Sequence, residues 1–213
     1  MLPKNEDEIV AQNSVSRETM GDLTAFSSDL QKWSKAINLV SPSTLPDLWR
    51  RHILDSVQLK RLAPKSPKHW CDIGSGGGLP GIVVALMLRD SSPQTTISLI
   101  ETDTRKAAFL RLSIKTYRLN AKVVCARIEE APRELADVVS ARALAPMNTL
   151  LGYVVRHMEP GGTALLPKGR NFQQEVEQAR RSWHFRLQIE QSAIDIESRI
   201  LMVSDIEPKV GPK

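Results

Sequence analysis

A glycine-rich segment carries the clearest chemical signal in this sequence. It comprises Asp72-Ile73-Gly74-Ser75-Gly76-Gly77-Gly78-Leu79-Pro80-Gly81, and it lies between a strand-like run, residues 69–71, and a helical apolar pattern over residues 82–88. Glycines between a strand and a helix let the backbone turn tightly and approach a ligand, toward which the helix N-terminus directs its free N–H groups. The segment therefore predicts a site for a nucleotide-containing cofactor.

The glycine spacing is compatible with two cofactors. Gly76-x-Gly78-x-x-Gly81 matches the fingerprint of dinucleotide-binding proteins, whereas Asp72-x-Gly74-x-Gly76-x-Gly78 matches the first motif of S-adenosylmethionine-dependent methyltransferases. A dinucleotide loop usually begins directly at the strand end, and in that register Leu79 stands where the third glycine belongs. The methyltransferase register needs no shift and is favoured. A loop that only makes a tight turn is the third interpretation.

Two further segments follow predicted strands and suit an adenosyl group. Glu101 ends a predicted strand over 95–101, where its carboxylate can accept hydrogen bonds from both ribose hydroxyls of S-adenosylmethionine or of NAD. The alternative is a solvated surface acid. Arg127-Ile128-Glu129 follows a predicted strand over 121–126, beside the expected adenine, where an apolar side chain can cover the base. By itself this tripeptide is also compatible with a plain loop.

The elements that must position these residues alternate along the chain. Strands are predicted at 68–73, 95–101, 121–126, 136–141 and 163–167, and helices at 80–89, 104–119, 146–157 and 171–181. Two last strands, at 185–189 and 200–206, are predicted to pair antiparallel. This order predicts an α/β fold with a doubly wound, mostly parallel sheet.

The first quarter of the chain is predicted to be a helical extension. Residues 1–15 are polar and expected to fray, apolar residues recur at helical spacing over 23–37, and one helix is predicted over 45–62. We therefore divide the chain into an N-terminal helical extension, residues 1–66, and a Rossmann-like core, residues 67–213. The two parts are expected to form one structural unit.

Composition limits the classes of protein that fit. The 213 residues include 29 Lys and Arg against 24 Asp and Glu, and the net charge of +5 permits a nucleic-acid partner without requiring one. Cys71 and Cys125 make neither a disulfide framework nor a zinc-ligand spacing, and both are expected to be buried structural cysteines. We find no signal peptide and no apolar run long enough to span a bilayer, so we expect a cytoplasmic protein with no membrane partner and no metal.

Besides the glycine loop, several short segments form a specific set in a fixed order. They are Lys32-Trp33-Ser34-Lys35-Ala36-Ile37-Asn38-Leu39, Arg51-His52-Ile53-Leu54-Asp55-Ser56, Lys106-Ala107-Ala108-Phe109-Leu110, Arg127-Ile128-Glu129-Glu130, Ser140-Ala141-Arg142-Ala143 and Leu166-Pro167-Lys168-Gly169. Together they resemble the bacterial small-subunit (16S) ribosomal RNA guanine-N7 methyltransferases, the glucose-inhibited division protein B family. The resemblance runs from Lys32 to about Lys209.

The resemblance implies a class I methyltransferase that uses S-adenosylmethionine to methylate N7 of a specific guanine in 16S ribosomal RNA of the small subunit. The cofactor contacts that it and the glycine motif imply are Gly74, Gly76, Leu79, Glu101, Ile128, Glu129 and Arg142. Guanine N7 carries a lone pair and no proton, so the reaction needs no general base. No catalytic acid–base pair is therefore nominated, and the catalytic residues stay unknown.

Basic residues near the expected site suit an RNA substrate. The candidates for phosphate contacts are Arg51, Lys106, Lys168 and Arg170, and for each a solvated surface charge is the alternative. His52 and Asp55 lie about one turn apart, and we expect them to pair structurally rather than to act in catalysis. Two other functions stay open: an NAD-dependent oxidoreductase, and a non-catalytic RNA-binding factor in ribosome assembly.

Overall fold

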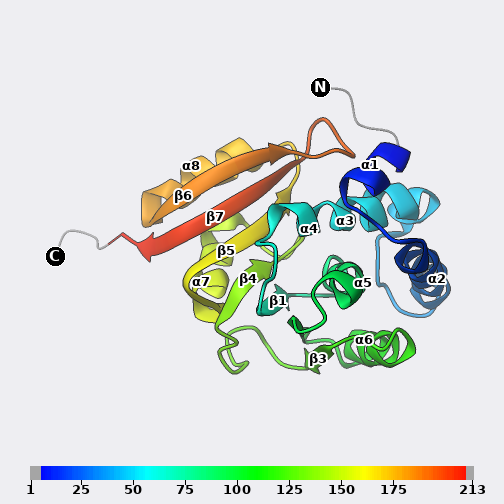
Figure 1. Ribbon diagram of the computed structural model, residues 1–213. Helices are drawn as coiled ribbons and strands as arrows, with labels where there is room; N and C mark the ends of the chain where they lie inside the picture. Colours follow the sequence, from blue (N-terminus) through cyan, green and yellow to red (C-terminus); the bar gives the residue numbers. More distant parts are fainter. Residues whose placement is uncertain (1–5, 210–213) are drawn as a thin grey trace.

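A single seven-stranded sheet runs through the middle of the molecule (Figure 1). The computed structural model describes residues 6–209. Its strands are β1 (His69–Ile73), β2 (Thr96–Ile100), β3 (Ala121–Val124), β4 (Ala136–Ser140), β5 (Met158–Lys168), β6 (Trp183–Gln191) and β7 (Arg199–Pro208). The order across the sheet is β3-β2-β1-β4-β5-β7-β6, with β1 to β5 parallel and β7 antiparallel to both of its neighbours. The predicted doubly wound sheet and the final antiparallel pair are confirmed.

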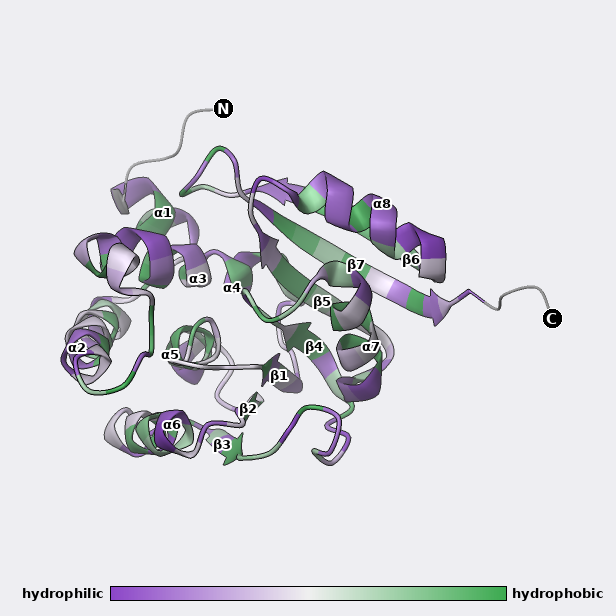
Figure 2. Cartoon of the chain, turned by 180° about the vertical axis from the view of Figure 1, so that it is seen from behind, coloured by the Kyte–Doolittle hydropathy of each residue, from purple (hydrophilic) through white to green (hydrophobic). Residues whose placement is uncertain are grey.

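Helices cover both faces of this sheet. The long helices α2 (Arg17–Ser34), α5 (Gly81–Ser91) and α6 (Thr104–Thr116) lie on one side, and α7 (Met147–His157) and α8 (Phe172–Ser182) lie on the other (Figure 1). Alternate strand residues serve the two faces, since Trp70 joins the core on the α5 side and Cys71 joins the core on the α7 side. In Figure 2, β4 and β5 are largely hydrophobic whereas the outer helix α8 is mostly hydrophilic. A sheet buried on both faces fits the near-continuous apolar strands in the sequence.

The segment between α2 and β1 differs from its prediction. In place of one helix over 45–62, the chain forms the short helices η1 (Pro42–Asp47), η2 (Trp49–Leu54), α3 (Asp55–Val57) and α4 (Leu59–Leu62). Pro46 lies inside η1, which is a 3₁₀ helix, and η2 has π-helical geometry. Leu54, Asp55 and Gln58, which join η2, α3 and α4, keep right-handed helical backbone angles. Residues 48–62 therefore stay helical with a π-helical stretch, and the departure from a regular α-helix lies in that stretch and in the 3₁₀ turn of η1.

The N-terminus also holds more structure than expected. Residues 1–5 lie outside the described part, but α1 (Glu6–Gln12) occupies much of the stretch that we expected to fray. Ile9 is 1% exposed and packs with Leu54 and Ile194, so α1 touches both the short helices and the turn between β6 and β7. Burial of one isoleucine of this kind stabilises by roughly 2 kcal/mol, which explains why α1 stays in place.

The α2 helix shares its core with the sheet. Phe26 and Phe109 stack with their ring centroids 6.1 Å apart, and Leu23 and Leu30 enter the same cluster as the apolar side of α5. The division of the chain into residues 1–66 and 67–213 stays a prediction. Among residues 6–209, no helix combines the length and the apolar character needed to cross a membrane.

The two cysteines differ from each other. Cys71 is buried in β1 as expected, and burial raises the pKa of its thiol well above the ordinary value. Cys125 is exposed, contrary to our expectation, because β3 ends at Val124 and the chain leaves the sheet there.

Candidate cofactor cleft

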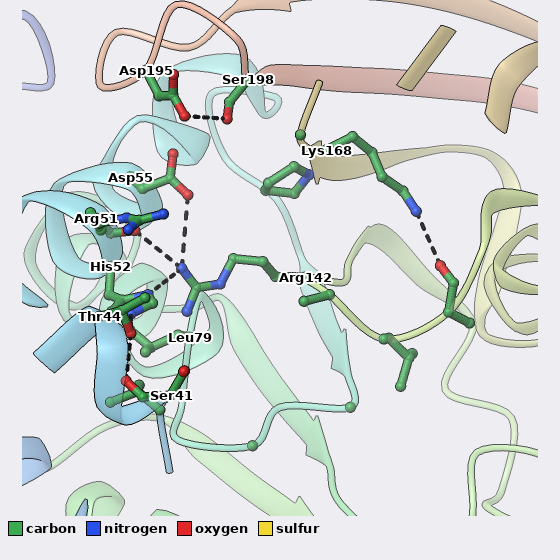
Figure 3. A pocket seen from close by; sticks show the side chains of 18 of the residues that line it. Ser41, Thr44, Arg51, His52, Asp55, Leu79, Arg142, Lys168, Asp195 and Ser198 are labelled. Atoms are coloured by element: carbon green, nitrogen blue, oxygen red, sulfur yellow. Dashed lines mark hydrogen bonds and ion pairs between the residues drawn. The ribbon is translucent and has the colours of Figure 1, made fainter. Parts of the chain in front are cut away.

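A cleft of about 950 Å³ opens where the carboxyl ends of β1, β4 and β5 meet (Figure 3). One wall is the glycine loop, a second is the segment 142–146 after β4, and a third is formed by residues 167–169 with α8. The short helices and residues 194–199 close the remaining side. The strand order reverses between β1 and β4, which is where doubly wound sheets bind ligands, and the volume lies within the range of small-molecule sites.

The glycine loop has the backbone conformation that its sequence requires. Gly74, Gly76 and Gly78 have φ of +69°, +53° and +83°, values that favour glycine. A Cβ at Gly78 would also lie 2.5 Å from Cγ1 of Ile82, so helix α5 packs directly on the loop. Gly74, Gly76 and Leu79 all line the cleft, and their contact with the cofactor stays a prediction.

Asp72 fixes the two ends of the loop. Its Oδ2 accepts a hydrogen bond from the Gly81 N–H at 3.2 Å, and its Oδ1 accepts one from the Ser140 hydroxyl at 2.6 Å. Burial raises the pKa of Asp72 to about 6, while these hydrogen bonds act in the opposite direction. The acid of the motif therefore joins β1, β4 and the start of α5, and it lies beneath the cleft rather than in it.

Glu101 accepts hydrogen bonds from the backbone of the glycine loop and of residue 103. Its Oε2 accepts the Gly76 N–H at 2.7 Å and its Oε1 accepts the Asp103 N–H at 2.8 Å. The side chain is buried and does not belong to the cleft lining. An ionised carboxylate has about four acceptor positions, so two bonds do not exhaust it. The predicted bond from Glu101 to ribose hydroxyls stays a prediction.

The predicted adenine segment is anchored by helix α7. The Tyr153 hydroxyl donates to Oε1 of Glu129 at 2.8 Å, and Nε2 of His157 lies 2.9 Å from the carbonyl oxygen of Ile128. Since a carbonyl only accepts, His157 donates from Nε2. Neither Ile128 nor Glu129 lines the cleft, so their contact with the cofactor stays a prediction.

Arg142 reaches from the end of β4 toward the short helices (Figure 3). Its Nη1 lies 2.8 Å from Nδ1 of His52, 3.8 Å from Oδ2 of Asp55 and 3.4 Å from the carbonyl oxygen of Arg51. The Arg142 side chain is only 17% exposed, so its guanidinium is largely enclosed by the cleft and the short helices. The structure shows no hydrogen bond between His52 and Asp55 themselves. We expected that pair, but both side chains meet Arg142 instead.

The electrostatics of this cluster follow from burial. Desolvation, with the positive charges of Arg142 and Arg51, lowers the pKa of His52 to about 4. The imidazole is therefore neutral at pH 7, and its Nδ1 accepts from Arg142 while its Nε2 donates to the Thr44 hydroxyl at 2.8 Å. Burial raises the pKa of Asp55, and Arg142 opposes that shift.

The four predicted RNA contacts do not lie together. Arg51 is exposed and lines the cleft. Lys168 also lines it, but its Nζ lies 2.7 Å from Oε2 of Glu175 and its side chain is only 9% exposed. Lys106, in the first turn of α6, and Arg170, which forms an exposed ion pair with Glu197 at 3.2 Å, lie outside the cleft lining.

The sequence did not predict one wall of the cleft. Ile194, Asp195 and Ser198 of the turn between β6 and β7 line it, together with Arg199 at the start of β7, and Ile194 is buried against the short helices. No local motif marks this turn. Only the insertion of β7 beside β5, which places the turn over the carboxyl ends of the parallel strands, brings it to the site. Among residues 6–209, no group of three or more His, Cys, Asp or Glu side chains is arranged to hold a metal ion.

The sheet order and the glycine loop at its point of reversal define a class I S-adenosylmethionine-dependent methyltransferase. Solved structures with this fold include an S-adenosylmethionine-dependent methyltransferase from Aquifex aeolicus, with a TM-score of 0.56 and 11% identity over 83% of this chain and 96% of that one. The TYW2 protein of M. jannaschii in complex with AdoMet gives a TM-score of 0.54 and 13% identity, over 74% of this chain and 76% of that one.

The family follows from the sequence comparisons. Residues 19–201 match the family model described as rRNA small subunit methyltransferase G. Curated proteins named ribosomal RNA small subunit methyltransferase G are 49% identical over 200 residues in Brucella anthropi, covering 93% of each chain, and 48% identical over 193 residues in Ruegeria sp., covering 91% of this chain and 94% of that one. This chain belongs to the rRNA small subunit methyltransferase G family.

The cleft fits S-adenosylmethionine, the cofactor of this class. A Cβ placed at Gly76 would meet no atom nearer than 3.9 Å, so the space beside the loop is open to a ligand. Arg142 presents a cation whose carboxylate partner stands 3.8 Å away, which leaves hydrogen-bonding capacity for an anionic group such as the cofactor carboxylate.

Proposed function

We propose that this chain transfers a methyl group from S-adenosylmethionine to N7 of one guanine in 16S ribosomal RNA of the small subunit. The observation that carries the proposal is the cleft itself, which joins the glycine loop to Arg142 at the reversal of strand order in a chain that matches the family over residues 19–201. The names of the relatives supply the RNA substrate. The choice of N7 follows from the resemblance described above.

The chemistry asked of the protein is positioning. The bound cofactor supplies an electrophilic methyl group, and guanine N7 supplies a lone pair without losing a proton. His52 suits this reaction, because its pKa of about 4 makes it a poor base and both of its ring nitrogens are hydrogen-bonded. The chain contributes orientation of the two reactants and exclusion of water.

The residues are assigned within this proposal as follows. Gly74, Gly76 and Leu79 lie against the cofactor, and Arg142 binds its carboxylate. Further cofactor contacts are proposed for Glu101 with the ribose and for Ile128 and Glu129 with the adenine. Residues 1–66 form the helical extension and residues 67–213 the core that carries the glycine loop.

The RNA contacts divide by position. Arg51 lies at the cleft and is placed to meet a phosphate next to the target nucleotide. Lys106 and Arg170 lie outside the cleft, so they would contact RNA that extends beyond that nucleotide. The target guanine is unpaired or extruded, because a base inside a helix does not reach a cleft of this kind.

The test is methyl transfer from radiolabelled S-adenosylmethionine to small ribosomal subunits that lack their native modification, followed by mapping of the labelled nucleotide. We expect label on a single guanine, released by cleavage chemistry selective for N7-methylguanine. Gly74→Asp is the negative control, since Gly74 has φ of +69° and a Cβ there would lie 2.6 Å from Leu144. Label on another atom or nucleotide would contradict the proposed target.

The same purified protein can be used to test the two alternative functions, an NAD-dependent oxidoreductase and a non-catalytic assembly factor. Calorimetry with S-adenosylmethionine and NAD side by side distinguishes a methyltransferase from an oxidoreductase. A non-catalytic assembly factor would bind the subunit without consuming the cofactor. The family match supports neither alternative.

A further inference from the structure

Lys168 and Glu175 form an ion pair inside the wall of the cleft. Lys168 is the last residue of β5 and Glu175 lies in the first turn of α8. Their charged atoms are 2.7 Å apart, and the side chains are only 9% and 27% exposed. A pair this short and this enclosed differs from the exposed pairs elsewhere on the surface, which contribute little.

The same two side chains form hydrogen bonds with the backbone of the segment after β4. Nζ of Lys168 donates to the carbonyl oxygen of Ala145 at 3.1 Å, and Oε2 of Glu175 accepts from the N–H of Met147 at 3.0 Å. Met147 is the first residue of α7, and Pro146, in the N-cap position, provides no side-chain hydrogen bond. Glu175 therefore takes the place of a cap for α7, and the pair fastens the segment at both ends.

The fastened segment is also the wall that faces the glycine loop. Residues 144–146 line the cleft. Leu144 packs so closely on Gly74 that a Cβ at Gly74 would lie 2.6 Å from its Cδ1. A shift of the segment after β4 would therefore change the shape of the cleft directly opposite the glycine loop.

We propose that Glu175, acting through Lys168 and the Met147 N–H, is a positioning residue that sets the segment 144–147 in the geometry needed for methyl transfer. Lys168 is then an internal structural cation and not a phosphate contact. This inference rests on the proposed function, because it concerns the alignment of the same methyl acceptor. Misplacement of a reacting group by about 1 Å costs on the order of a hundredfold in rate.

The experiment compares Glu175→Leu, Lys168→Met and the conservative Glu175→Gln, which keeps an acceptor oxygen for Met147. The measured quantities are kcat, KM for S-adenosylmethionine and the salt dependence of subunit binding. We expect kcat to fall about ten- to hundredfold in the first two variants and less in Glu175→Gln, with KM changed by less than about threefold and the salt slope unchanged. The double variant should be no worse than the poorer single variant, because both act on one segment.

A matched control is available in the exposed pair of Arg186 and Asp205, whose charged atoms lie 3.2 Å apart and which is outside the cleft lining. Arg186→Met and Asp205→Asn should leave kcat unchanged. Thermal unfolding identifies any variant that fails to fold. Amide hydrogen exchange at Met147 gives a readout independent of activity, and we expect faster exchange in Glu175→Leu than in Glu175→Gln.

The outcomes are distinct. A salt slope lower by about one in Lys168→Met, with kcat unchanged, would make Lys168 a phosphate contact and overturn the inference. Wild-type kcat and wild-type exchange at Met147 in both Glu175 variants would overturn it as well. Absence of methyl transfer by the wild-type protein would instead contradict the proposed function, and the exchange measurement would still decide whether Glu175 holds the segment.

Discussion

Arg142 and Lys168 are two cations in one cleft with opposite arrangements of partners. Lys168 is 2.7 Å from a carboxylate and donates a second bond to a carbonyl oxygen, so its charge is compensated inside the protein. Arg142 has its carboxylate at 3.8 Å and a neutral imidazole at 2.8 Å, so its charge is only partly compensated. In Figure 3, Arg142 points toward the short helices and Lys168 points away from them. A basic residue at a strand end is therefore available to a ligand only when its own chain has not neutralised its charge.

The partners of the two cations also differ in their distance along the chain. Glu175 lies seven residues after Lys168, whereas His52 lies 90 residues before Arg142. The structure thus completes the Lys168 pair locally, within one strand-to-helix connection. The environment of Arg142 depends on docking of the short helices against the core.

The strongest test of the comparison is removal of each cation in turn. Arg142→Met should weaken S-adenosylmethionine binding by about ten- to hundredfold, because a charge-assisted hydrogen bond contributes about 1.5–3 kcal/mol. Lys168→Met should leave that affinity within about threefold of wild type. Isothermal titration calorimetry measures both values, and an equal loss in the two variants would remove the distinction between them.

His52 is the uncharged partner of Arg142, so its removal tests how far that partner prepares Arg142 for the ligand. His52→Leu removes the acceptor at Nδ1 and should weaken S-adenosylmethionine binding by about three- to tenfold, since one hydrogen bond contributes about 0.5–1.5 kcal/mol. His52→Asn keeps an oxygen acceptor near that position and should retain most of the affinity. If Asn and Leu behave alike in calorimetry, the imidazole does not orient Arg142.

The pH dependence of stability offers a third test. The pKa of His52 is about 4 in the folded chain, below its ordinary 6.5, because of burial and of the charges of Arg142 and Arg51. The unfolded chain therefore binds more protons between these values, and His52 makes stability fall as the pH drops from about 6.5 to about 4. Urea unfolding of wild type and His52→Asn across this range should show a smaller acid loss in the variant.

Asp72 changes stability in the opposite direction over a similar pH range, and it serves as the control for the His52 measurement. Its pKa is raised to about 6, so the folded chain takes up its proton first and Asp72 favours the fold as the pH falls from about 6 toward 3.8. Asp72→Asn should therefore lose stability relative to wild type more at pH 4 than at pH 7. If the free energy of unfolding changes with pH in both variants as it does in wild type, both pKa assignments are contradicted.

The smallest expected effect concerns Arg51, the exposed cation of the cleft. Arg51→Met should lower the salt slope of subunit binding by about one and weaken binding by about threefold at moderate salt, while cofactor affinity stays unchanged. Filter binding over a series of salt concentrations measures the slope. A slope that stays at the wild-type value would remove Arg51 from the proposed RNA contacts.

The sequence predicted those features that depend on neighbours along the chain. The alternation of strands and helices, the glycine loop and its position after β1 were all confirmed, because turn chemistry and apolar pattern are local. The helix predicted over 45–62 was confirmed only in part: residues 48–62 are helical, but Trp49–Leu54 has π-helical geometry and the predicted start belongs to a 3₁₀ helix. Apolar spacing alone does not distinguish these helix types.

What the sequence did not predict was the choice of partner. His52 and Asp55 are neighbours on one segment, yet His52 accepts from Arg142 at 2.8 Å, while Asp55 accepts from Gln58 at 2.9 Å and lies 3.8 Å from Arg142. Only the folded sheet brings Arg142 near them. The ion pair of Lys168 was not predicted either, because Glu175 is on a helix whose direction the sequence leaves open. The turn 194–199 reached the cleft through strand order, which no local pattern encodes.

The position of β7 between β5 and β6 determines when the cleft is finished during synthesis. A ribosome releases the chain from its N-terminus, so the parallel strands β1 to β5 and the glycine loop emerge before the hairpin that follows them. Until β7 arrives, the outer edge of β5 has unpaired backbone groups, and residues 194–199 are absent from the cleft. A newly made chain thus gains its complete cleft only after β7 has been synthesised, and nascent chains stopped before residue 199 carry an open sheet edge that invites aggregation.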